Sequence, residues 1–211
     1  MITATSEGSG NFQPIESGTY PARCYSMIHI GTIEEEFNGE KKRQNKVRIS
    51  WELPTELKEF KEGDGEKPYV MSKEFTLSLH EKSTLRAFLK SWRGKDFTDD
   101  EAKAFDVTKL LGVPCMISIG HTEKNGKTYA NVNSVSPLLK GYTMPAQINP
   151  NFELNYDNFT LDAFNKLPEF LRDKMKRSEE FSKIANALEA IDAERVNVNS
   201  PVDNQNDDLP F

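Results

Sequence analysis

Alternating apolar and polar residues dominate the chain between residues 16 and 139, and this period of two is typical of β-strands. Residues 46–53 show it most clearly, because every second residue there is large and apolar: Val47, Ile49, Trp51 and Leu53. Residues 19–30 predict an earlier long strand. We expect one of its faces to carry Ala22, Cys24, Ile28 and Ile30, and the other to carry Arg23, Tyr25, Met27 and His29. A third strand is predicted over residues 69–79, after a polar loop over residues 54–68.

Two turn signals join these strands into hairpins. Asn38-Gly39 lies in the charged segment between the first and second strands. Asn125-Gly126 separates two further strands, predicted over residues 114–122 and 128–136. Asn-Gly favours the positive φ angles of a type I′ turn, so each pair predicts a tight hairpin.

Between the third and fourth strands the spacing changes to that of a helix. Four apolar residues recur at intervals of three or four: Leu85, Phe88, Leu89 and Trp92. Gly94 follows as a C-cap, and Thr98 with Glu101 has capping-box spacing for a short second helix. Three strands, a helical insertion and two strands is the order of an OB-fold, a five-stranded barrel, although other small barrels share it.

The chain therefore divides into four parts. We expect a flexible leader over residues 1–13, an OB-fold domain over residues 14–140, a connector with a helical region over residues 141–194, and a disordered tail over residues 195–211. In the helical region Pro168 breaks the pattern, and Ser178 can cap a third segment. The predicted fold class is mainly β with C-terminal helices.

Composition places the chain among globular proteins and restricts its setting. The 211 residues are enough for one substantial core, and no apolar run approaches the ~20 residues that span a membrane. The two cysteines are too few for a disulfide scaffold and fit a reducing cytoplasm, so we expect a cytoplasmic protein with no membrane partner.

The formal net charge of −6 is unevenly distributed. Residues 1–150 contain 20 Lys and Arg against 20 Asp and Glu, whereas residues 151–211 contain 7 against 13. The acidity therefore belongs to the C-terminal part, and it does not exclude a polyanion partner for the strand-rich part.

The last five residues combine two carboxylates with an apolar, aromatic end: Asp207, Asp208, Leu209, Pro210 and Phe211. Such a tip can insert its aromatic ring into an apolar pocket while its carboxylates meet Arg or Lys at the rim. An ordinary solvated tail is the alternative. A large apolar residue at the very end favours docking to a partner protein.

This tip resembles the acidic C-terminal tip of bacterial single-stranded DNA-binding proteins. The body of the chain looks like a group of phage-encoded proteins that are taken to bind single-stranded DNA. The similar segments are residues 14–32, SWELP at 50–54, residues 72–94, KTYANVNSVSPL at 127–138 and LPEFL at 167–171. The resemblance implies an OB-like barrel, binding of single strands without sequence preference during phage DNA replication or recombination, recruitment of replication or recombination proteins through the tip, and a location in the host cytoplasm. The bacterial proteins' tetrameric assembly does not carry over, so homo-oligomerisation is left open.

Binding single strands without sequence preference requires cations for the phosphates and aromatic faces for the bases. The densest basic run lies at the tip and start of the second strand, and further lysines flank the last hairpin. We expect these cations to contact phosphates: Lys41, Lys42, Arg43, Lys46, Arg48, Lys124 and Lys127, with Arg23 and Lys73 on neighbouring strands. A solvated hairpin tip, partly neutralised by nearby glutamates, is the alternative.

Strand parity sorts the aromatic residues. Trp51 and Trp92 belong with core positions. Tyr25 and Tyr129 lie on polar faces and are the better candidates for stacking, beside Asn131; Tyr69 and Phe75 are further candidates.

No sequence motif indicates catalysis, a metal site or a cofactor. The three histidines lie on separate predicted elements, and the spacings typical of zinc, calcium and phosphate-loop sites are absent from the sequence. We therefore expect a binding protein and not an enzyme. Two alternatives stay open: a protein–protein adaptor whose barrel binds no nucleic acid, and a nuclease or annealing accessory protein.

Overall fold

The computed structural model describes residues 14–37 and 39–185. Its strands are β1 (Gly18–Phe37), β2 (Glu40–Glu59), β3 (Glu66–Thr76), β4 (Pro114–Lys124), β5 (Lys127–Ser136) and the short β6 (Phe152–Leu154). Its helices are α1 (Thr84–Arg93), α2 (Asp99–Lys103), α3 (Leu161–Asn165) and α4 (Glu169–Lys176). A 3₁₀ turn covers Val107–Leu110, and residues 179–185 form a further helical segment.

The strands form one sheet in the order β3-β2-β1-β4-β5, with antiparallel neighbours, and β6 adds to β1 in parallel. A mainly β fold with C-terminal helices is therefore confirmed. No ladder joins β3 to β5 among the described strands, so the sheet is open. One side chain crosses between these two end strands, because Lys73 Nζ donates to the Val132 carbonyl at 2.7 Å.

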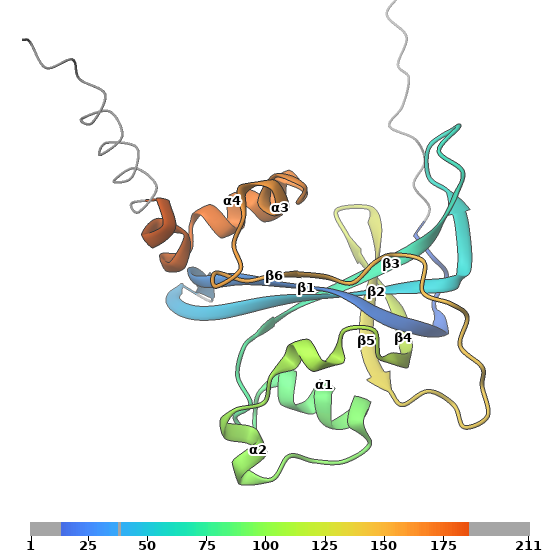
Figure 1. Ribbon diagram of the computed structural model, residues 1–211, viewed down its shortest axis with the longest axis horizontal. Helices are drawn as coiled ribbons and strands as arrows, with labels where there is room; N and C mark the ends of the chain where they lie inside the picture. Colours follow the sequence, from blue (N-terminus) through green and yellow to red (C-terminus); the bar gives the residue numbers. More distant parts are fainter. Residues whose placement is uncertain (1–13, 38, 186–211) are drawn as a thin grey trace, which may run out of the picture.

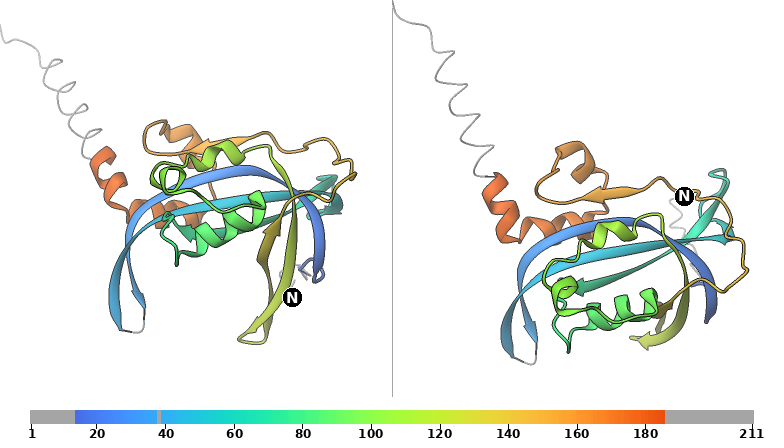
Figure 2. Two further views of the ribbon diagram at one scale, coloured as in Figure 1. Left: turned by 90° about the horizontal axis from the view of Figure 1, so that it is seen from below. Right: turned by 60° about the horizontal axis from the view of Figure 1, so that its bottom comes forward.

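Local signals predicted the hairpins and the helical insertion correctly. The β4–β5 turn has positive φ at Asn125 (52°) and Gly126 (70°), as a type I′ turn requires. Ser83 caps α1 at its start and Gly94 ends it in the left-handed region, at φ 68°. Figure 2 shows the β1–β2 and β4–β5 hairpins extending from the body toward the same side.

Two predictions about the strands were wrong. The polar loop expected over residues 54–68 is mostly a hairpin, because β2 continues to Glu59 and β3 begins at Glu66. The connector contains β6, whose three residues pair with Ser26, Met27 and Ile28. A strand this short carries no periodic signal of its own.

Helices lie on both sides of the sheet (Figure 1), and an apolar cluster packs on each of its faces. On one face, α1 buries its apolar stripe against β3 and β5, and the ring centroids of Trp92 in α1 and Trp51 in β2 lie 5.9 Å apart. On the other face, α3 and α4 pack Phe164, Leu171 and Met175 over the middle of β1.

A β-bulge explains how β1 serves both cores. The pairing with β2 shifts between Cys24 and Ser26, so Tyr25 is an extra residue in the ladder. An extra residue reverses the inward and outward alternation beyond it. Met27 therefore joins Cys24 in the first core, whereas Ile28 and Ile30 face the second core. The prediction that these isoleucines share a face with Ala22 was wrong for this reason.

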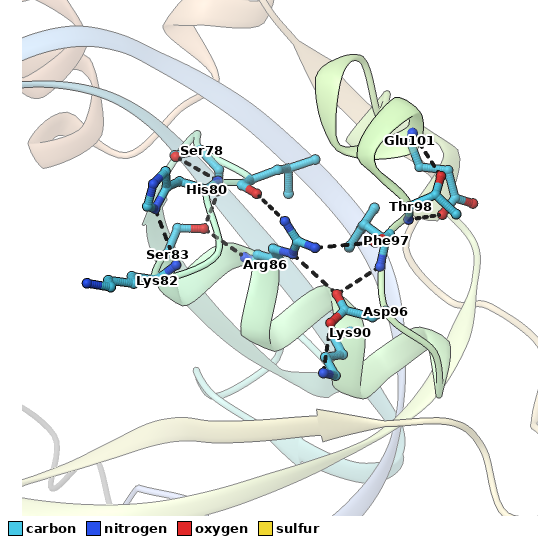
Figure 3. Close-up of polar contacts among 11 residues, drawn as sticks. Ser78, His80, Lys82, Ser83, Arg86, Lys90, Asp96, Phe97, Thr98 and Glu101 are labelled. Atoms are coloured by element: carbon cyan, nitrogen blue, oxygen red, sulfur yellow. Dashed lines mark hydrogen bonds and ion pairs between the residues drawn. The ribbon is translucent and has the colours of Figure 1, made fainter.

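A polar network holds α1 and the following segment together (Figure 3). The Arg86 guanidinium donates to the carbonyls of Leu79 and Phe97 and to the Asp96 carboxylate. Asp96 also accepts from Lys90 and from the Phe97 amide. The Lys90 hydrogen bond is the largest contribution, followed by the Phe97 amide, and together they lower the pKa of Asp96 to about 2. In α2, Thr98 and Glu101 form the predicted capping box.

The C-terminal helical region is fastened to the β1–β2 hairpin. Glu180 accepts from the amide and hydroxyl of Thr32 at 2.6 and 2.7 Å. Ser178 caps the 179–185 segment through a hydrogen bond from the Phe181 amide, as the sequence predicted. Gly31, at φ 96°, allows the close approach, since a Cβ there would lie 2.7 Å from Ser178 Cβ. Among the described helices, none is long and apolar enough to cross a membrane.

Candidate nucleic-acid interface

A groove of about 490 Å³ lies between the outer face of the sheet and the C-terminal region. Its floor comes from β1, β2 and β3, and its walls come from residues 149–152 and 166–171. The floor residues are Tyr25, Ser26, Ile28, Arg48, Ser50, Val70 and Ser72. The groove is thus lined by β1 and by segments that lie more than 100 residues later in the sequence.

The aromatic side chain most available in this groove is Phe170. It follows the first residue of α4 and is 56% exposed, which is high for a large apolar ring. The Arg48 guanidinium carbon lies 5.3 Å from the centroid of the Phe170 ring, within cation–π range. An exposed ring beside a cation is the arrangement that can stack a base and hold the adjoining phosphate.

Tyr25 enters the groove from the bulge in β1. Its ring is half-buried, and burial raises the pKa of its phenol, with a smaller contribution from the charge of Glu52. The phenol therefore stays protonated at neutral pH and remains a hydrogen-bond donor. Beside it, Ser50 Oγ and Ser72 Oγ hydrogen-bond to each other at 2.9 Å and give the floor a polar strip.

Two cations border the groove. Arg48 lies 3.4 Å from a carboxylate oxygen of Glu74, and Lys166 lies 2.6 Å from one of Asp162. The Lys166 pair is exposed, and such surface pairs contribute little free energy. A phosphate can therefore compete for Lys166 at low cost.

The predicted basic run on the β1–β2 hairpin is largely neutralised. Lys41 pairs with Glu34 at 2.8 Å, and Arg43 forms a two-point ion pair with Glu179. The hydrogen bonds that Lys41 and Arg43 donate to these carboxylates raise the pKa of both cations. Two further pairs follow the same pattern: Lys42 with Glu40 and Lys46 with Glu35. The run lies at the surface as expected, but its charge is balanced by carboxylates of the hairpin and of the C-terminal region.

The β4–β5 hairpin offers a second, separate set of predicted residues. Lys124 and Lys127 are exposed at its tip, and Tyr129 is 48% exposed. Asn131 is less available, because its amide nitrogen donates to Thr122 Oγ1 and to the Tyr129 carbonyl. This set does not line the groove that contains Tyr25 and Arg48.

Several predicted site residues have structural contacts that leave them little freedom to bind a ligand. Phe75 is 3% exposed and packs edge-to-face on Phe88, so its assignment to a stacking surface was wrong. Arg23 donates to two backbone carbonyls, those of Gly112 and Pro145. The alternation of β3 explains the burial of Phe75, because Phe75 shares the inward face of that strand with Met71.

Two further predicted residues also have partners. Lys73 lies on the inward face of β3, where burial lowers its pKa. Its ammonium covers the Phe88 ring and binds the Val132 carbonyl. Tyr69 packs edge-to-face against Phe60 on the β2–β3 hairpin.

Sequence reasoning missed the groove residues that come from beyond residue 140. These are Asn149, Pro150, Phe152, Lys166, Leu167, Pro168, Phe170 and Leu171. The sequence contained one signal for Phe170. It directly precedes Leu171, and two adjacent residues of a helix point in different directions, so only one of them can join the apolar stripe. Two adjacent large apolar residues on a short helix leave one of them outside the core.

The described residues contain no group of three or more His, Cys, Asp or Glu side chains that could hold a metal ion. Burial raises the pKa of the Cys24 thiol to about 12, and burial also raises the pKa of the Cys115 thiol above its ordinary value. Both cysteines are buried and pack as small apolar side chains. The predicted partner-binding tip, residues 207–211, lies outside the described residues.

Comparisons with known proteins add no family assignment. No protein-family model matches the chain, and no curated protein matches its sequence.

Proposed function

We propose that this chain binds single-stranded DNA without sequence preference, with the groove between the sheet and the C-terminal helices as its primary contact. The observation that carries the proposal is the exposed Phe170 ring beside Arg48, with Tyr25 and Lys166 lining the same groove. Stacking faces interleaved with cations are the common feature of single-strand-binding surfaces. The groove's polar strip of serines is short and offers no extended pattern to read a base sequence.

The proposal includes an OB-fold for residues 14–140. Three observations support it: the strand order β3-β2-β1-β4-β5, the position of α1 between β3 and β4, and the Lys73 bridge from β3 to β5. In an OB-fold the outer face of strands 2 and 3, with the loops after strands 1 and 4, binds oligonucleotides. The groove floor includes that face, and both hairpins extend from the same side of the body (Figure 2).

The tip at residues 207–211 completes the proposal as the partner-recruiting element. Its two aspartates and terminal Phe211 suit a pocket with a basic rim on another protein. The protein thus holds single strands through its body and brings replication or recombination proteins to them through its tail, as its resemblance to phage-encoded proteins implies.

A titration of the full-length protein with a fluorescently labelled oligo-dT across salt concentrations tests this function. We expect binding that weakens with the logarithm of salt, with a slope of about −0.7 per phosphate contacted. Arg48→Gln is expected to lower the magnitude of that slope by about 0.7, whereas Lys103→Gln, on the remote helix α2, leaves it unchanged.

Two other outcomes distinguish the alternative functions. No binding at low salt contradicts the proposal and favours the protein–protein adaptor. Cleavage of the oligonucleotide when a divalent metal is added favours a nuclease.

A further inference from the structure

Arg23 and Glu52 are direct cross-strand partners in the β1–β2 ladder, yet they form no ion pair with each other within the described structure. Opposite charges at such a position normally meet across the strands. Here each side chain instead binds the connector that follows β5. The two residues hold the connector at two points, four residues apart.

Glu52 holds the later point. Its side chain is fully buried, at 0% exposed. One carboxylate oxygen accepts from the Ile148 amide at 2.9 Å. The other accepts from the amide and the side-chain nitrogen of Asn149, at 2.7 and 2.8 Å. Three donors thus converge on one carboxylate that has no cation partner among the described residues.

Arg23 holds the earlier point. Its guanidinium donates to the Pro145 carbonyl at 3.2 Å and to the Gly112 carbonyl at 2.8 Å. The second bond ties the same side chain to the segment just before β4. Residues 145–149 are therefore fixed to the sheet by a donor at one end and an acceptor at the other.

Apolar packing does not account for how this segment is held. Ile148, its largest apolar residue, is about half exposed, so little hydrophobic burial fixes it. A buried carboxylate is costly unless its hydrogen bonds are satisfied, and a packed apolar residue is commonly cheaper for stability alone. The polar contacts of Arg23 and Glu52 therefore fix the position of residues 145–149 more than they stabilise the fold.

The position of this segment determines the shape of one wall of the groove. Asn149 and Pro150 line it directly after the segment that Glu52 holds. Glu52 takes one N–H of the Asn149 side-chain amide and so fixes the orientation of that amide, whose second N–H and carbonyl oxygen remain for a ligand. That oxygen accepts hydrogen bonds, as the N–H groups on the edge of a nucleic-acid base require.

We infer that Arg23 and Glu52 are positioning residues, which set the wall of the single-strand groove and orient Asn149 as an acceptor toward a bound base. This inference rests on the proposed function. Neither residue touches the strand itself. Arg23 is therefore reassigned from a phosphate contact to a support of the binding surface.

The test compares Glu52→Gln with Glu56→Gln, a matched control on the same strand whose carboxylate accepts a hydrogen bond from its neighbour Thr55. Glutamine retains one acceptor oxygen, so at least one of the three converging donors loses its partner. We expect Glu52→Gln to weaken oligo-dT binding about 3- to 10-fold, the effect of one lost hydrogen bond, with an unchanged salt slope. Hydrogen exchange at the Ile148 and Asn149 amides should accelerate in the same variant. Glu56→Gln should change neither quantity.

Asn149→Asp is the second variant, because it leaves the buried carboxylate intact and lies in a connector. It places a second carboxylate against Glu52 and should weaken oligo-dT binding at least as much. Wild-type affinity in both variants overturns the inference. A salt slope reduced by about 0.7 in Glu52→Gln also overturns it, since a phosphate contact has then been lost. If the wild-type protein binds no oligo-dT, the proposed function fails, while unchanged exchange at residues 148 and 149 separately rejects the support by Glu52.

Discussion

At the scale of single residues, one contrast explains which predicted cations remain candidates. Lys41 and Arg43 were expected to be the phosphate track, but each meets a glutamate at the surface. Arg48 also has a glutamate neighbour, yet it additionally lies over the Phe170 ring in the groove. Arg48 is therefore the better candidate to bind a strand, because it lies beside an aromatic ring. The density of charge along the sequence does not identify it.

Phe170→Ala tests the stacking face. Loss of one aromatic–base stack costs about 1–3 kcal/mol, so we expect oligo-dT affinity to fall roughly 5- to 150-fold. The melting temperature should change little, because the ring is mostly exposed. Leu161→Ala is the matched control: it removes a side chain of similar exposure, 54%, from outside the groove. Equal affinities for both variants would show that the strand does not contact Phe170.

Asp96 provides a residue-scale prediction for pH. Its folded pKa, about 2, lies below the ordinary 3.8, so its hydrogen bonds add stability above pH 3.8 and lose it as the pH falls toward 2. Asp96→Asn should therefore lower the melting temperature at neutral pH. The difference from wild type should shrink between pH 4 and pH 2 in a series of thermal melts. Asp157→Asn, at the surface, serves as control; a difference that persists at pH 2 contradicts the assignment.

Strand parity predicted the core residues of β2 correctly, because apolar and polar residues alternate regularly over residues 46–53. It misassigned Ile28 and Ile30 because a bulge at Tyr25 reverses the alternation, and one extra residue leaves no mark in the composition. Buried Glu52 was also missed. Its burial depends on a connector almost 100 residues later, so no local pattern could reveal it.

At the scale of elements, hairpins and capped helices were predictable because their signals are local. Asn125-Gly126 fixes one turn, and Ser83, Thr98 and Ser178 each cap a helical segment through a side chain within three residues. The groove was not predictable in the same way. Its walls come from β6 and the C-terminal helices, whose place on the sheet is set by tertiary contacts alone.

The hydrogen bonds between Thr32 and Glu180, which attach the 179–185 segment to β1, can be tested directly. Burial acts to raise the pKa of Glu180, but hydrogen bonds from Thr32 outweigh it and the pKa is lowered. Glu180→Gln should weaken this attachment by about 1.5 kcal/mol, the lower end of what a hydrogen bond to a charged group contributes. Hydrogen exchange at the Thr32 amide should accelerate about tenfold. Its neighbour Glu179→Gln, which loses only an exposed ion pair with Arg43, should have a much smaller effect.

At the scale of the whole molecule, the charge distribution fits the two activities that we propose. The −6 charge belongs to residues 151–211, while the first 150 residues are balanced and contain most of the sheet. A neutral body with local cations can hold a polyanion, and an acidic end can meet a basic partner. The acidic isoelectric point of the chain therefore does not argue against nucleic acid.

Deleting residues 207–211 tests this division. We expect the truncated protein to bind oligo-dT with the same or modestly higher affinity, because five residues with two carboxylates and no cation are removed. Capture of replication or recombination proteins by the immobilised protein should be lost. A control with Asp207 and Asp208 intact but Asn204→Ala should retain both activities. A large loss of oligo-dT affinity on deletion would contradict the assigned roles.

The central claim is that a single strand lies in the groove beside Phe170. Photo-cross-linking tests it most directly, with the full-length protein bound to oligo-dT that carries 5-iodouracil and with the attached peptides identified by mass spectrometry. We expect cross-links to Phe170 and Tyr25, which line the same groove. Efficient binding with cross-links confined to Tyr129 on the β4–β5 hairpin would contradict it.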